Sequence, residues 1–143
     1  MSDMTEFANK IFSSQPFSNF IGAELDHVGK NSAQISAMMR EDLRQQHGYA
    51  HGGVISYLAD NSLTFAGGLA LGGDALTAEF KINYVSPARG KKLIARASTL
   101  SSGSRQAVCQ SLIYSVDEEG TELLCAAAQG TIVATSPTPR EGN

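Results

Sequence analysis

The segment 45–60 combines a polar loop, two consecutive glycines and one carboxylate. His51, Gly52 and Gly53 stand where the loop gives way to an apolar helical run, so the first N–H groups of the helix lack intrahelical acceptors. These groups also carry the positive end of the helix dipole. Such a site stabilises an oxygen that gains negative charge during attack on a carbonyl. Because glycine destabilises a helix, this pair favours a functional N–H over simple close packing.

Asp60 is the only carboxylate of the expected helix 51–66. It lies about nine residues from the helix start, far from the first turn, where a carboxylate stabilises a helix. Its neighbours Leu58, Ala59 and Leu63 are apolar, which favours partial burial. A carboxylate there serves as a general base or a nucleophile, and the alternative is an outward-facing, solvated side chain.

The spacing of Gly52 and Asp60 predicts a shared site. Eight residues correspond to about 12 Å along a helix, too far for both groups to contact one reacting carbonyl. Two copies with antiparallel helices would bring residue 52 of one copy to residue 60 of the other, with the twofold axis near Ser56. We therefore expect two active sites per homodimer.

Hydrophobic periodicity outlines the elements that position these groups. A short amphipathic helix is expected over 3–13, two strands flank a turn at 29–31, and a polar loop covers 41–50. The long helix should end at Gly67 and Gly68. Segment 76–84 alternates as a strand does, so every second side chain should lie on one face. These side chains are Leu76, Ala78, Phe80, Ile82 and Tyr84.

Strands 91–100, 105–116 and 122–134 are expected to follow as a meander with strand 76–84. One long apolar helix among antiparallel strands predicts an α+β fold in which the sheet wraps around the helix. The exposed edges of such a sheet favour pairing with a second copy.

Composition narrows the class of protein. The chain has 143 residues, a net charge of −3, 42% hydrophobic residues and no basic run, so we expect no nucleic-acid partner. No apolar stretch reaches the length of a membrane span, and residues 1–10 lack the pattern of a signal peptide. Cys109 and Cys125 stand in strand-like runs and are expected to be buried, reduced thiols. These features favour a cytoplasmic protein without membrane association.

The residues Gly48, His51, Gly52, Gly53 and Asp60 resemble the core motif of hotdog-fold acyl-CoA thioesterases of the phenylacetyl-CoA thioesterase (PaaI-like) family. Residues 84–88, with the sequence Tyr-Val-Ser-Pro-Ala, resemble the end of a strand in that family. The resemblance covers about residues 15–135. One departure is Gln45, which stands where the family has asparagine.

The resemblance implies one hotdog domain over 1–143, with an N-terminal helix within 1–14 and a loose tail at 136–143. In this family the N–H of Gly52 polarises the thioester carbonyl, and Asp60 is the nucleophile or general base. Thr77 helps to orient the attacking water, and the longer amide of Gln45 could still reach the carbonyl or the water. No cofactor is expected beyond the coenzyme A of the substrate.

Further residues are candidates for substrate binding. The acyl pocket is expected to include Asn61, Thr64 and Phe65, with Gly53 at the start of the helix. The coenzyme A phosphates need cations, and the candidates are Arg89, Lys91, Lys92 and Arg105. His51 is a general base by residue type, but its position favours a hydrogen-bonding role in the loop. No set of residues has metal-ligand spacing, so no metal is expected.

Two alternatives stay open. One is a hotdog hydratase or dehydratase acting on enoyl or hydroxyacyl thioesters, although His51 and Asp60 fall on opposite faces of the helix at about 100° per residue. The other is a non-catalytic acyl-CoA-binding protein in which Asp60 is structural. The acyl group, and whether homodimers pair into a dimer of dimers (a homotetramer), are left undetermined by the sequence.

Overall fold

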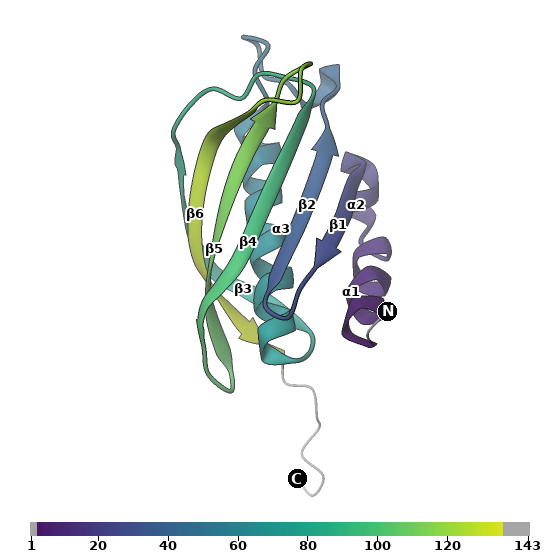
Figure 1. The fold of residues 1–143 in the computed structure, drawn as a ribbon, viewed down its shortest axis with the longest axis vertical. Coiled ribbons are helices and arrows are strands. Elements are labelled where there is room, and N and C mark those ends of the chain that lie inside the picture. The colour runs from purple at the N-terminus through teal and green to yellow at the C-terminus, as the bar shows by residue number, and fades with distance from the viewer. Residues whose placement is uncertain (1–2, 136–143) are drawn as a thin grey trace, which may run out of the picture.

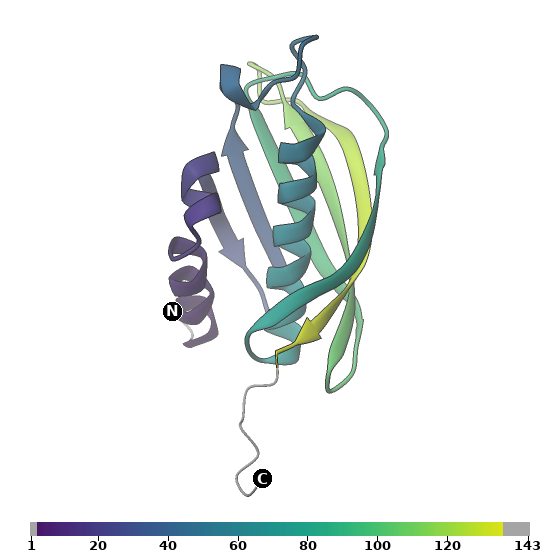
Figure 2. The same ribbon diagram turned by 180° about the vertical axis from the view of Figure 1, so that it is seen from behind.

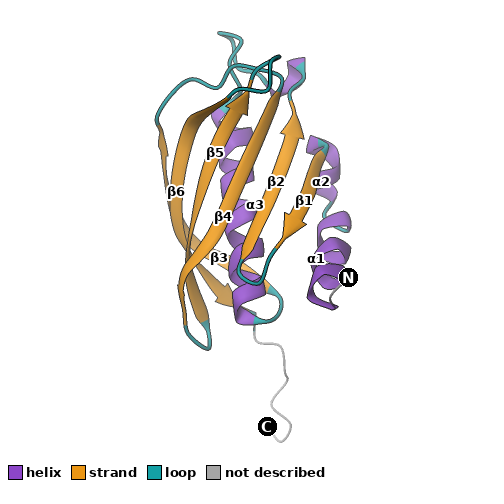
Figure 3. Ribbon diagram, in the orientation of Figure 1, coloured by secondary structure: helices purple, strands orange, loops and turns teal. Residues whose placement is uncertain are grey.

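The computed structural model describes residues 3–135, in which an antiparallel sheet curves around one long helix (Figure 1, Figure 3). The helices are α1 (Asp3–Ser13), α2 (Pro16–Ile21), the 3₁₀ helix η1 (Glu41–Leu43) and α3 (Gly52–Leu71). The strands are β1 (Ala23–Val28), β2 (Ser32–Met38), β3 (Ala75–Tyr84), β4 (Lys92–Ser102), β5 (Gln106–Val116) and β6 (Glu122–Ala134). This is the α+β fold that the periodicity predicts.

The order of strands differs from the expected meander. The sheet runs β1-β2-β4-β5-β6-β3, so β4, β5 and β6 form consecutive hairpins while β3 pairs with β6 at the edge. The β3–β4 connection crosses one end of the molecule, which lets β2 pair with β4. Turn signals predicted the hairpins, but they hold no information about which edge β3 joins.

Helix α3 is longer than expected, and the prediction that it ends at Gly67 and Gly68 is wrong. An alanine Cβ at position 67 would lie 2.6 Å from the Cβ of Ile132, so this glycine permits close packing against β6. The helix ends instead at Gly72, which has a φ of 83° and caps the carbonyls of residues 68 and 69. Left-handed backbone favours glycine at this position.

The prediction that Leu76 shares a face with Phe80 and Ile82 is also wrong. A bulge between Thr77 and Glu79 shifts the register of β3 against β6. At the bulge, two residues of β3 lie opposite one residue of β6, so the residues before and after it no longer alternate on the same faces. Leu76 is 63% exposed, whereas Phe80 and Ile82 pack against the core. The bulge turns Thr77 toward α3.

The core lies between α3 and the concave face of the sheet. Fully buried side chains meet there from the helix and from strands β2, β4, β5 and β6, among them Leu58, Leu63, Ile35, Leu93, Ile113 and Ile132. Cys109 and Cys125 are buried, unpaired thiols, as expected. Burial raises the pKa of the Cys125 thiol to about 11.

Two helices precede the sheet, of which the sequence analysis expected only the first. The second helix, α2, spans only 6 residues. It begins with Pro16 and ends at Gly22, which has left-handed backbone, and both are common at these helix positions. Phe12 of α1 packs edge-on against Phe65 of α3, with ring centroids 5.7 Å apart. The expected loose tail at 136–143 lies outside the described residues.

One side of α3 has no sheet over it. Seen from behind, the helix runs between the α1–α2 pair and β3 (Figure 2). A stripe on this side is only partly buried and includes Gly52, Ser56, Tyr57, Asp60 and Thr64. This open stripe contains the candidate site residues. Within residues 3–135, no helix is long and apolar enough to cross a membrane.

Candidate active site

The start of α3 presents a free backbone donor. His51 is the N-cap, and its Nδ1 accepts a hydrogen bond of 2.8 Å from the N–H of Gly53. Within residues 3–135 the N–H of Gly52 donates to no acceptor, while that of Val54 donates to the carbonyl of His51. The ring of His51 therefore has a capping role that leaves the Gly52 N–H as the available donor.

Tyr84 holds this end of the helix against β3. Its hydroxyl lies 3.1 Å from the carbonyl oxygen of Gly52 and 2.6 Å from the Oγ of Ser56. An alanine Cβ at position 52 would lie 3.3 Å from the Tyr84 hydroxyl, which leaves little room for a side chain. From the sequence, Tyr84 was expected only at a strand end, without a role in the site.

Gln45 lies in the loop that faces the helix start. Its Oε1 accepts from the N–H of His47, and its backbone N–H donates to the carbonyl of Tyr49 at 2.9 Å. These bonds close the loop at Gly48, which has a φ of 87°. The amide NH₂ of Gln45 has no acceptor among the described residues, so it is available to a carbonyl or a water.

A cavity of about 470 Å³ opens at this end of α3. Its lining comes from the 45–50 loop, the start of the helix and the segment after β3, including Gln45, Gly52, Tyr84 and Pro87. Arg89 lies at the same end and stacks on Tyr49, with its guanidinium carbon 4.5 Å from the ring centroid. The candidate oxyanion donor and one candidate phosphate ligand thus belong to the same region.

The four candidate cations do not gather in one place. Lys91 and Lys92 lie at the end of the sheet where the Lys91 N–H donates to the carbonyl of Val116. Arg105 lies in the β4–β5 turn, where its carbonyl accepts from Ala134 at the opposite end of the sheet (Figure 1). Within one subunit, Arg105 is therefore separated from Arg89 and the two lysines.

Asp60 is held by a chain of hydroxyls. Its Oδ1 accepts a 2.6 Å hydrogen bond from Thr77 of β3, and the Oγ1 of Thr77 lies 2.7 Å from that of Thr64. Thr64 also lies 2.8 Å from the carbonyl of Asp60. The second carboxylate oxygen has no partner among residues 3–135. One oxygen is fixed and the other is available for chemistry.

A polar cluster from α2 and α3 forms one wall of the opening beside Asp60. Ser18 bonds Gln15 at 2.6 Å and the hydroxyl of Tyr57 at 2.5 Å, while Asn61 donates to Gln15 at 3.0 Å. Burial raises the pKa of Tyr57, against the lowering effect of its bonds to Ser18 and Asn61. Asn61 is thus part of a helix-to-helix network.

Asn61 was expected in the site from the sequence, but its partners Gln15 and Ser18 were not. They lie 46 and 43 residues away in the chain, and a short polar stretch before a proline carries no local signal of this contact. The same holds for Phe17, which lines the Asp60 opening and packs edge-on against Tyr57 with ring centroids 5.3 Å apart.

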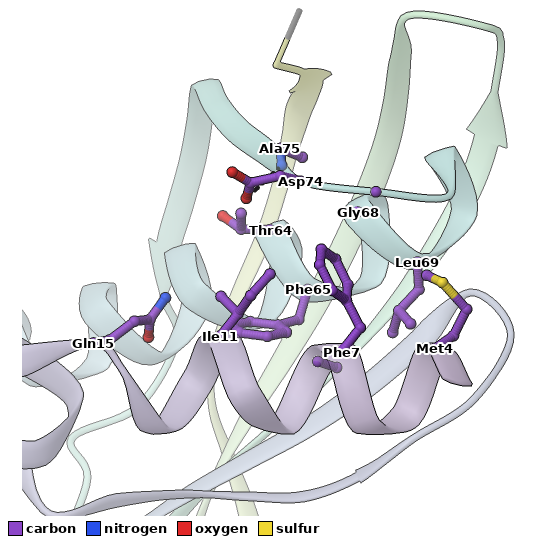
Figure 4. A pocket seen from close by; sticks show the side chains of 12 residues that line it. Met4, Phe7, Ile11, Gln15, Thr64, Phe65, Gly68, Leu69, Asp74 and Ala75 are labelled. Atoms are coloured by element: carbon purple, nitrogen blue, oxygen red, sulfur yellow. Dashed lines mark hydrogen bonds between the residues drawn. The ribbon is translucent and has the colours of Figure 1, made fainter. Parts of the chain in front are cut away.

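Phe65 is turned away from the Asp60 opening. It lines a smaller cavity between α1 and α3, across which Phe7 and Ile11 point toward it (Figure 4). Thr64 lines this cavity as well as contacting Thr77. Of the expected acyl-pocket residues, Asn61 therefore faces the larger opening, Phe65 faces the smaller one, and Thr64 connects the smaller cavity to Asp60.

Comparison with known proteins agrees with this architecture. Residues 47–122 match the thioesterase superfamily. A relative in Saccharolobus solfataricus, named as an esterase, is 30% identical over 138 residues, covering 93% of this chain and 87% of the relative. A thioesterase family protein from Silicibacter pomeroyi superposes with a TM-score of 0.85 at 27% identity, covering 90% of this chain and 95% of that chain.

The phenylacetic acid degradation protein PaaI of Thermus thermophilus is also similar. It has a TM-score of 0.74 and 27% identity, and the match covers 85% of this chain and 100% of that chain. The expected hotdog thioesterase resemblance is confirmed by these matches and by the helix wrapped in its sheet. The chain belongs to the thioesterase superfamily and is a hotdog-fold thioester hydrolase.

Proposed function

We propose that this thioester hydrolase acts on acyl-CoA and that each active site combines Gly52 of one subunit with Asp60 of another. The observation that carries the proposal is that one continuous helix holds two polar groups without hydrogen-bond partners. The Gly52 N–H and the second oxygen of Asp60 lack partners within residues 3–135. They are separated by about 12 Å along α3. For reaction, a single thioester carbonyl must lie about 3 Å from both the N–H donor and the attacking group.

The open stripe on α3 supports a homodimer. Antiparallel packing of two such stripes around an axis near Ser56 would place each Gly52 beside the Asp60 of the other subunit. The stripe includes two small residues, Gly52 and Ser56, near the proposed axis. Small residues allow two helices to approach closely. Association of such dimers in pairs would give the tetramer that the sequence analysis also considered.

In the proposed reaction, the thioester carbonyl oxygen accepts a hydrogen bond from Gly52, aided by the dipole of α3. Asp60 takes a proton from water, and the hydroxide oxygen bonds to the carbonyl carbon. The carbon–sulfur bond then breaks and the CoA sulfur receives the proton. Alternatively, the Asp60 carboxylate attacks the carbon and breaks the carbon–sulfur bond, forming an anhydride. Water then hydrolyses the anhydride, and one proton of that water goes to the CoA thiolate. Both routes give a free acid and CoA without a further cofactor.

The neighbouring side chains have supporting roles in this proposal. Thr77 orients Asp60, and the free amide of Gln45 holds the carbonyl oxygen or the water. Arg89 and Lys91 are the candidates for the CoA phosphates because they lie at the Gly52 end of the sheet. Arg89 would have to leave the ring of Tyr49 and also the Tyr49 hydroxyl, to which it donates a 2.5 Å hydrogen bond.

A heterodimer experiment tests the shared site. Gly52→Pro removes the N–H in one subunit, and Asp60→Asn removes the carboxylate in the other. Each homodimer should be inactive in a thiol-release assay. A purified heterodimer with different tags should recover about half of the wild-type rate, because one of its two sites is then intact. Activity that stays at the level of the homodimers would place both groups of a site in one subunit.

A further inference from the structure

The small cavity between α1 and α3 has an apolar lining. Five large apolar side chains contribute to it, three from α1 and two from α3, namely Met4, Phe7, Ile11, Phe65 and Leu69 (Figure 4). Its volume is about 60 Å³, which gives room for roughly four carbon atoms. The size and apolar lining of this cavity match the end of a hydrocarbon chain or part of an aromatic ring.

Two residues connect this cavity to the candidate catalytic carboxylate. Gln15 lines both the cavity and the Asp60 opening. Thr64 lines the cavity and contacts Thr77 at 2.7 Å, and Thr77 donates to Asp60 at 2.6 Å. Thr64 follows Asp60 by one helical turn, a rise of about 6 Å. A chain attached to a carbonyl at Asp60 could therefore pass Thr64 into the cavity.

The charges around the cavity select a neutral group. Among residues 3–135, no lysine or arginine lines it, and Asp74 at its margin uses Oδ1 to accept the N–H of Ala75 at 3.0 Å. A phosphate or a free carboxylate would meet a negative charge there without a compensating cation. The candidate cations Arg89 and Lys91 lie toward the Gly52 end of α3, where Arg89 stacks on Tyr49.

We propose that this cavity receives the distal end of the acyl group and that α1 thereby sets acyl-chain preference. This inference rests on the proposed acyl-CoA thioesterase function. Helix α1 lies outside the segment 47–122 shared with the superfamily. The pocket wall can therefore change without change to Gly52, Asp60 or Thr77. Phe7 and Ile11 are specificity-determining residues.

Two variants test the pocket in opposite directions. Ile11→Trp fills it, and Phe7→Ala enlarges it at a side chain that is already 40% exposed. Phe20→Ala is the matched control, because Phe20 is 69% exposed on α2 and lines neither cavity. The measurement is kcat/KM for acetyl-, hexanoyl- and decanoyl-CoA.

We expect Ile11→Trp to lower kcat/KM for hexanoyl-CoA by about tenfold or more relative to acetyl-CoA, since each buried methylene contributes about fourfold. Phe7→Ala should raise the rate on decanoyl-CoA relative to hexanoyl-CoA by several fold, and Phe20→Ala should leave both ratios unchanged. If both ratios stay at the wild-type values in the two pocket variants, the cavity does not receive the acyl chain.

A binding measurement separates failure of the pocket from failure of the function. In the Asp60→Asn background, calorimetry gives the Kd of hexanoyl-CoA with and without Ile11→Trp. Weaker binding of hexanoyl-CoA but not of acetyl-CoA supports the pocket even if the wild-type protein releases no thiol. If the wild-type protein releases thiol but Asp60→Asn binds hexanoyl-CoA with the same Kd with and without Ile11→Trp, the function is supported and the pocket is overturned.

Discussion

The two ends of the site on α3 are built in different ways. At Gly52 the candidate group is a peptide N–H, positioned by the cap of His51 and by the start of the helix. At Asp60 it is a side chain, positioned by Thr77 from a strand that follows the helix. The first end depends on backbone geometry in one short segment, and the second depends on tertiary contacts. The two ends should therefore respond to different substitutions.

Asp60→Asn should have the largest effect, because it removes the proposed base or nucleophile with little change in shape. We expect kcat to fall by about 10³-fold or more, with acyl-CoA binding retained. Thiol release and calorimetry measure the two quantities. Glu79→Gln is the control, since this exposed carboxylate on β3 bonds only Thr131 among the described residues. Full activity of Asp60→Asn would remove this residue from the mechanism.

Gly52→Pro tests the backbone end separately. Proline is favoured at the first position of a helix, and the extended backbone of His51, with a ψ of 139°, is compatible with it. The substitution removes the N–H, so we expect kcat to fall by about 10²–10³-fold while Tm changes little. Gly52→Ala adds a side-chain carbon but keeps the N–H.

The two substitutions at position 52 give a decisive comparison. If the N–H stabilises the oxyanion, Gly52→Ala must be much more active than Gly52→Pro. Equal loss in both variants would mean that crowding against Tyr84, and not the donor, explains the effect.

Thr77→Val tests the side-chain end through positioning. The variant keeps the shape of threonine but removes the hydroxyl that donates to Asp60. We expect kcat to fall by about tenfold, with KM nearly unchanged, because the carboxylate loses its fixed orientation. Thr131→Val on the neighbouring strand is the control. A parallel loss in the control would indicate a general effect on the sheet.

His51→Ala should have the smallest effect on activity and should act mainly on stability. Loss of the N-cap acceptor should cost about 1 kcal/mol in the free energy of unfolding, measured by chemical denaturation. We expect kcat to change only a few fold. His51→Asn, which retains a capping acceptor, should recover the stability. A loss of kcat comparable with that of Asp60→Asn, without a loss of stability, would assign the ring to catalysis.

Much of the fold could be predicted because the relevant signals are local. Two strands were expected on either side of a turn at 29–31, and β1 and β2 lie there; Ala33, Ile35 and Ala37 alternate along β2 and are buried. Alternation also placed Leu76 on the face of Phe80 and Ile82, which is wrong because the bulge after Thr77 depends on how β3 pairs with β6. The predicted end of α3 was also too early, since Gly67 serves close packing against Ile132 from a distant strand.

By itself, the sequence determined the helix start at His51-Gly52-Gly53, the position of Asp60 within the helix and the distance between them. These follow from helix geometry, which is the same wherever the helix lies. Only the tertiary structure decided that Thr77 donates to the Asp60 carboxylate and contacts Thr64, that Gln15 and Ser18 line the opening beside Asp60, and that α1 closes an apolar cavity nearby. Those contacts join residues far apart in the chain, and their formation depends on packing that no local pattern specifies.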